Sequence, residues 1–82
     1  MNYVLTQHAR DVLQEREISL DWMERVLADP AHTEPDLLDK GLEHRLGRIP
    51  EFGNRVLRVV IARDEPFRII TVYFDRTMKG MP

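Results

Sequence analysis

The sequence predicts an α+β domain in which two N-terminal helices cover one face of a mostly antiparallel sheet of three to five strands. Two observations lead to this class: apolar residues recur at helical spacing in the first third of the chain, and they alternate with a period of two from residue 42 onward. Short turns between the later segments indicate antiparallel hairpins. With 82 residues the chain has room for one domain, placed at 1–78 and followed by a frayed tail at 79–82.

The N-terminal part is expected to hold a short strand and two helices. A β-prone segment at 3–5 precedes helices at 7–17 and 20–28. Thr6 and Ser19 stand directly before these helices, and each hydroxyl can accept a hydrogen bond from the first turn. The helices therefore have both an apolar stripe and a defined start.

The C-terminal part is expected to be a meander of strands. A polar loop at 31–40, with an edge strand around 32–34, leads into strands at 42–49, 55–63 and 67–76. The predicted element order is β-α-α-β-β-β.

Alternation along each strand divides its side chains between a face under the helices and an open face. We assign the more apolar set of each strand to the helix side, which also puts His44 there. The open face then carries Arg45, Arg58, Thr71 and Tyr73. A single bulge would reverse the assignment beyond it.

Charge is divided unevenly along the chain, although the net charge is only −2. Residues 1–43 sum to −6 and residues 44–82 to +4, which indicates a polyanion partner or charged self-association. Arginine binds phosphate bidentately and tyrosine stacks on unpaired bases, so RNA is the expected partner of such a face. The alternative is a solvated face on which Glu43 and Asp75 pair with the arginines.

Several classes of protein are excluded by what the sequence lacks. There is no apolar run long enough to span a membrane and no signal peptide, so a cytoplasmic location is expected. The absence of cysteine, of a G-x-S-x-G motif and of a glycine-rich loop argues against nucleophilic and nucleotide-dependent catalysis. His8, His32 and His44 lack metal-ligand spacing, so neither a metal nor a cofactor is expected.

RNA cleavage through the 2′-hydroxyl is compatible with this sequence, because it needs only a base, an acid and positive charge. Arg58 would stabilise the phosphate charge, and Tyr73 or His44 would move protons. The residues expected to hold the RNA are Arg45, Arg76, Lys79 and His8.

The stretch at 7–19 resembles the opening H-A-x-x-R-x-x-x-R-G-I-S of a family of small bacterial proteins of unknown function. That family is compared with the RelE and BrnT toxins, and segments 55–60 and 71–74 resemble its last two strands. His8 matches the opening, whereas Val12 and Glu17 stand where arginine and glycine are usual. The resemblance implies a RelE-like fold, an RNA-cleaving activity and an acidic antitoxin partner.

A second hypothesis is a non-catalytic interaction module, for instance a homodimer that packs its open sheet face against another chain. The expected contact residues are Tyr73, Val56, Val60 and Ile69, with arginines around them.

Overall fold

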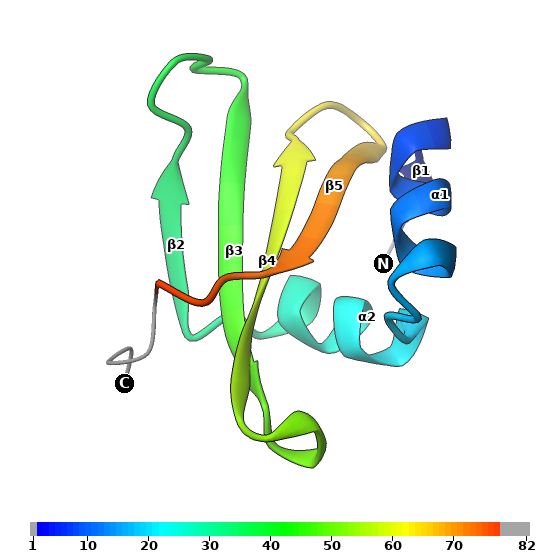
Figure 1. Cartoon of the computed structure of the whole chain (residues 1–82). Coiled ribbons are helices and arrows are strands. Elements are labelled where there is room, and N and C mark those ends of the chain that lie inside the picture. Colours follow the sequence, from blue (N-terminus) through cyan, green and yellow to red (C-terminus); the bar gives the residue numbers. More distant parts are fainter. Residues whose placement is uncertain (1, 78–82) are drawn as a thin grey trace.

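The structure of the chain, a computed structural model, describes residues 2–77 and confirms the predicted α+β class (Figure 1). Its elements are β1 (Tyr3–Leu5), α1 (Gln7–Glu15), α2 (Leu20–Ala28), β2 (His32–Pro35), β3 (Leu42–Ile49), the 3-10 helix η1 (Pro50–Phe52), β4 (Arg55–Ala62) and β5 (Phe67–Phe74). The predicted tail at 79–82, with Lys79, lies outside the described residues.

The five strands form one mixed sheet in the order β1-β5-β4-β3-β2. Neighbours from β2 to β5 are antiparallel, as their short turns predicted, whereas β1 pairs in parallel with β5. Both helices lie on one side of the sheet, with α1 against β5 and β1 and α2 against β3 and β4 (Figure 1). We call the sheet face opposite the helices the second face.

A buried apolar core joins the helices to the sheet. It is built from side chains of both helices and of the central strands: Ala9, Leu13, Met23, Val26, Leu27, Ile49, Leu57, Val59, Ile61, Ile69 and Val72. The second face has a smaller buried cluster, formed by Leu46 and Val56. Burial of these apolar side chains is the main force that stabilises so small a domain.

Both predicted helix caps are present. The Oγ1 atom of Thr6 accepts a hydrogen bond from the Ala9 amide, and Oγ of Ser19 accepts one from the Asp21 amide, each at 3.1 Å. Because these hydroxyls satisfy amides that have no partner inside the helix, they fix where each helix begins.

Helix α1 ends two residues earlier than predicted, because the chain turns into a left-handed cap. Glu17 has φ +54°, its amide donates to the Gln14 carbonyl, and the Ile18 amide donates to the Leu13 carbonyl. These two bonds form a Schellman motif, in which glycine is the usual left-handed residue.

Replacing Glu17 with glycine is therefore expected to raise the free energy of unfolding by about 0.5–1 kcal/mol. Glycine adopts the left-handed conformation without the steric cost that glutamate carries. Urea denaturation followed by circular dichroism measures the change. Glu15→Gly, inside the helix, is the control and should lower stability by about 1 kcal/mol; a loss from both variants would contradict the prediction.

Strand β3 directs toward the helices the set of side chains that was predicted to lie on the open face. Arg45 pairs with Val59 and Gly47 with Leu57, whose side chains lie in the helix-side core. Arg45 and Gly47 therefore face the helices, and His44 faces the second face. The physical reason is close packing at Gly47: a Cβ atom there would lie 3.2 Å from Cγ2 of Val26 in α2, so this position has no room for a large apolar side chain.

Strand β5 contains an irregularity that the sequence did not locate. The register shifts between Val60 and Ile61, so that Thr71 pairs with Val60 and Ile69 with Ile61, leaving Ile70 as an extra residue. Ile69 consequently lies in the core rather than on the second face, contrary to the prediction.

Candidate functional site

The second face brings polar side chains from four strands together in two cross-strand rows. The first row, in the order β2 to β5, is His32, Leu46, Arg58 and Tyr73. The second row, in the same order, is Glu34, His44, Val60 and Thr71. The register therefore gathers Arg58, Tyr73 and His44, the three residues predicted to be catalytic, on one face.

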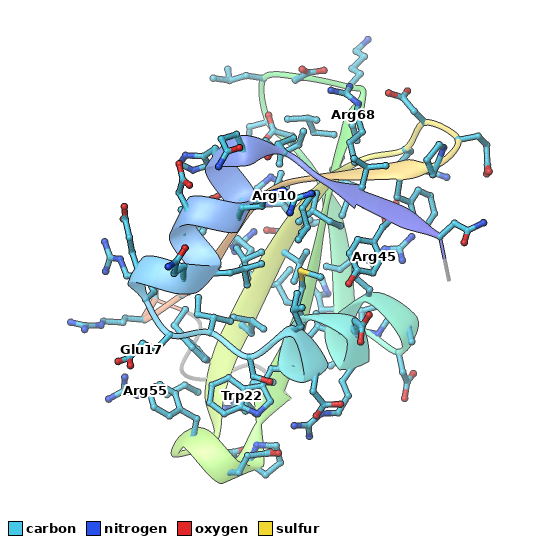
Figure 2. All side chains as sticks on the ribbon, turned by 90° about the vertical axis from the view of Figure 1, so that its right-hand side faces the viewer. Arg10, Glu17, Trp22, Arg45, Arg55 and Arg68 are labelled. Carbon is cyan, nitrogen blue, oxygen red and sulfur yellow. The ribbon has the colours of Figure 1, made fainter. Side chains whose placement is uncertain are left out.

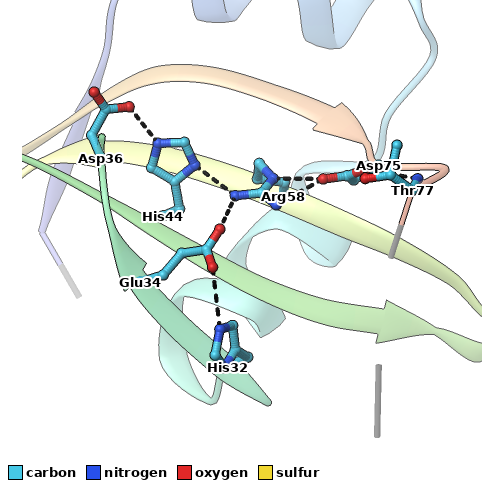
Figure 3. A network of polar contacts seen from close by, with 7 residues as sticks. All are labelled: His32, Glu34, Asp36, His44, Arg58, Asp75 and Thr77. Carbon is cyan, nitrogen blue, oxygen red and sulfur yellow. Dashed lines mark hydrogen bonds and ion pairs between the residues drawn. The ribbon is translucent and has the colours of Figure 1, made fainter. Parts of the chain in front are cut away.

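Arg58 is the centre of a polar network (Figure 3). Its Nε and Nη2 atoms donate to Oδ2 of Asp75 at 2.9 and 2.7 Å, and Nη1 donates to Oε1 of Glu34 at 2.7 Å. Nη1 also lies 2.7 Å from Nδ1 of His44. Because Arg58 is only 7% exposed, its charge is balanced by these carboxylates rather than by water.

The contacts of His44 define its protonation state. A guanidinium can only donate hydrogen bonds, so Nδ1 of His44 must accept from Arg58 and its proton must be on Nε2. That Nε2 atom lies 2.7 Å from Oδ1 of Asp36, which accepts the bond (Figure 3). His44 is thus a neutral imidazole held between a carboxylate and a cation, with its lone pair aimed at Arg58.

The carboxylates around Arg58 are held in their charged form. Hydrogen bonds from the hydroxyl and amide of Thr77, together with the Arg58 guanidinium, lower the pKa of Asp75. The hydrogen bond from Arg58, with a smaller one from His32, lowers the pKa of Glu34. Burial acts to lower the pKa of Arg58, but the hydrogen bonds to Glu34 and Asp75 outweigh it, so the net shift is upward.

We expect the domain to lose stability in acid because of Asp75 and Glu34. Their pKa values are lower in the folded chain than their ordinary values of 3.8 and 4.5, so their contribution is complete above about pH 5 and disappears as the pH falls below about 4. Urea denaturation over this range measures it. Thr77→Val removes one cause of the lowered Asp75 pKa, so the free energy of unfolding should fall less steeply in acid. Glu65→Gln, in the exposed hairpin, should leave this pH dependence unchanged. The same pH dependence in both variants would contradict the prediction.

Arg45 does not belong to this site, which corrects its predicted role on the open face. Its Nη1 atom donates to the Leu27 carbonyl of α2 at 2.7 Å, and Nε lies 2.6 Å from Oε2 of Glu43. Its guanidinium carbon also lies 5.0 Å from the centre of the Phe67 ring. Figure 2, which shows the molecule from the helix side, has Arg45 between β1 and α2. Arg45 is therefore a packing residue between layers.

Two other predicted RNA-binding residues, His8 and Arg76, lie around the edges of the second face, and Lys79 is outside the described residues. Nε2 of His8, in the first turn of α1, lies 3.2 Å from Oγ1 of Thr71 at the end of the second row. Arg76 is exposed in the segment that follows β5. Tyr73 is 42% exposed beside Arg58, so it is the catalytic candidate most accessible to a ligand.

Sequence reasoning missed the acidic half of the network. An edge strand around 32–34 was predicted, but Glu34 and Asp36 were given no role, although residues 32, 34 and 36 alternate in a way that puts three ionisable side chains on one side of that segment. That alternation was the available signal. Using it to place the carboxylates near Arg58 required the pairing of β2 with β3, which local sequence does not determine.

Together, the fold and site define a small α+β domain with a charge-balanced arginine network on the uncovered face of its sheet. The chain belongs to the family described as a domain of unknown function (DUF4258), whose sequence model matches residues 5–74. This agrees with the expected membership in a family of small proteins of unknown function. No curated protein and no solved structure gave a significant match. No helix within residues 2–77 is long and apolar enough to cross a membrane.

Proposed function

We propose that this protein binds RNA and cleaves it without a metal ion, as a RelE- or BrnT-like toxin with an acidic antitoxin would. One observation carries the proposal: the cross-strand cluster of His44, Arg58 and Tyr73 combines a basic lone pair, a guanidinium and a phenol on one face. These are the groups that transesterification of RNA needs.

In the proposed reaction, Nδ1 of His44 takes the proton of a ribose 2′-hydroxyl, and the 2′-oxygen attacks the adjacent phosphorus. The bond from phosphorus to the 5′-oxygen breaks, and that oxygen takes the phenol proton of Tyr73. The products are a 2′,3′-cyclic phosphate and a 5′-hydroxyl. Arg58 stabilises the charge on the phosphoryl oxygens, and Asp36 stabilises the imidazolium through Nε2.

The substrate phosphate has to take a position that a carboxylate of the protein now holds. The Glu34 side chain is 37% exposed and that of Asp75 only 11%, so Glu34 returns to water at the lower cost. We therefore expect the phosphate to displace Glu34 from Nη1 of Arg58. The guanidinium then turns toward the phosphate and releases Nδ1 of His44, which is free to act as a base.

Cleavage of a labelled single-stranded RNA in the presence of EDTA, with mapping of the product ends, tests the proposal. We expect 2′,3′-cyclic phosphate ends, and a loss of rate of about 10²-fold or more for His44→Gln and Tyr73→Phe. Tyr3→Phe is the matched control, because Tyr3 lies on the helix side and bonds to Glu24. No cleavage by the unaltered protein, or equal rates in all variants, would refute it.

A second candidate function, a homodimeric or partner-binding module, is supported by a different surface. Of the four residues expected to form its contact, Val56, Val60 and Ile69 are buried, and only Tyr73 is exposed. In contrast, Leu37 and Leu38, in the loop between β2 and β3, are each 97% exposed. Sedimentation at micromolar concentration should show a dimer that Leu37→Ser/Leu38→Ser dissociates; a monomer would count against this candidate.

A further inference from the structure

A hollow of about 680 Å³ opens at the hairpin end of the sheet, where η1 precedes β4 and the chain leaves β5. Its walls are contributed by separate parts of the chain: Arg48 of β3, Asn54 and Arg55 before and at the start of β4, and Phe74, Arg76 and Thr77 at and after the end of β5. A hollow of this size is within the range of small-molecule sites. It is separate from the His44 cluster, and none of the functions above assigns it a ligand.

Positive charge predominates in this hollow. Three arginines line it, and the one carboxylate, Asp75, is occupied by other groups: Oδ2 by Arg58, and Oδ1 by the amide and hydroxyl of Thr77. Arg55 and Arg76 make no ion pair with any residue from 2 to 77, so their charge is available to an anion. Several arginines around one hollow favour a phosphate ligand.

Aromatic rings lie beside these arginines. The rings of Phe52 and Phe74 are 4.9 Å apart, and Trp22 contacts both of them, with ring centres at 5.3 Å from Phe52 and 6.1 Å from Phe74. The guanidinium carbon of Arg55 lies 4.9 Å above the Phe52 ring. Phe74 is the aromatic residue that lines the hollow, and Phe52 packs against it, so a planar group in the hollow can lie against Phe74. Flat apolar rings beside phosphate-binding cations are the combination used to hold unpaired nucleotides.

We infer that the hollow binds one nucleotide of a single-stranded RNA, with the base against Phe74 and the phosphate on Arg55 and Arg76. The inference rests on the proposed function and extends it to the nucleotide next to the cleaved bond. Asp75 is the link, because it lines the hollow and also holds Arg58. An RNA strand whose phosphate lies at Arg58 therefore places its next nucleotide in the hollow.

Binding of a labelled RNA oligomer to the His44→Gln protein, measured by fluorescence anisotropy, tests the inference without cleavage. Arg55→Gln/Arg76→Gln should weaken binding about tenfold and reduce the slope of log K against log salt by about 1 to 1.5. Arg63→Gln/Arg68→Gln removes the same charge at the opposite hairpin, where both arginines pair with carboxylates, and should change binding much less. Equal losses in both double variants would overturn the inference.

Nuclear magnetic resonance on the unaltered sequence provides a second readout that needs no variant to fold. Uridine monophosphate should shift the amide signals of Gly53, Asn54 and Thr77, and inorganic phosphate alone should shift them less at the same concentration, because it lacks a base. Equal shifts from both ligands would show that the base makes no contact in the hollow. Shifts confined to other amides would show that the nucleotide binds elsewhere and would overturn the inference. Metal-free cleavage with no change at these amides would leave the proposed function standing and reject the hollow.

Discussion

Replacing Arg58 with methionine is expected to lower the free energy of unfolding by about 3 kcal/mol. The substitution keeps much of the apolar stem but leaves Asp75 and Glu34 without their common cation in a largely buried place. It also leaves Nδ1 of His44 without a donor. Urea denaturation at neutral pH, followed by circular dichroism, measures the change.

A control and a rescue separate this effect from a general loss of charge. Arg63→Met removes an arginine that is 67% exposed and 3.5 Å from Glu43, and should change stability by less than about 0.5 kcal/mol. Adding Glu34→Gln and Asp75→Asn to Arg58→Met removes the unpaired charges and should recover much of the loss. If Arg58→Met costs no more than Arg63→Met, the network does not stabilise the fold.

This stability effect also decides how the proposed activity is tested. A domain of this size has about 5 kcal/mol of stability available, so an Arg58 variant that lost activity would be partly unfolded as well. Tyr73 is half-exposed and makes no side-chain hydrogen bond within residues 2–77, so Tyr73→Phe removes the phenol oxygen with little effect on the fold. Tyr73 is therefore the more informative test of cleavage.

Most of the elements could be predicted because their signals are local. Ser19 caps α2, which spans Leu20–Ala28 as expected, and β3 spans Leu42–Ile49 as its alternation indicated. Capping and alternation depend on neighbours within a few residues, which a single sequence contains in full. Strand β5 was predicted two residues too long, because Asp75 turns away to bind Arg58 and Thr77.

The candidate site could be predicted only in part, because its electrostatics depend on strand pairing. Splitting the chain at residue 43 indicated acidic helices and a basic sheet. The structure instead brings Glu34, from the acidic half, to Arg58, from the basic half. β2 and β4 each pair with β3, and the register of these two pairings places Glu34 near Arg58, which no local pattern contains. The charge of the second face is consequently much nearer balance than the sequence suggested.

Gly47 is the position where close packing most directly explains the inverted face of β3. Gly47→Val is expected to lower the free energy of unfolding by about 2 kcal/mol, because its side chain would be forced against Val26 and would push α2 from the sheet. Glycine inside a strand often marks such a close approach. Thermal and urea denaturation measure the loss.

The contact with Val26 can be isolated by a double-mutant cycle. Gly47→Ala places a Cβ 3.2 Å from Cγ2 of Val26, so it should be unfavourable in the native background. In a Val26→Ala background that methyl group is gone, and alanine should then be neutral or stabilising, since it is a better strand residue than glycine. We expect a coupling energy of about 1 kcal/mol between the two positions. Additive effects would mean that α2 adjusts freely over β3, and that the polar helix-side face of β3 needs another explanation.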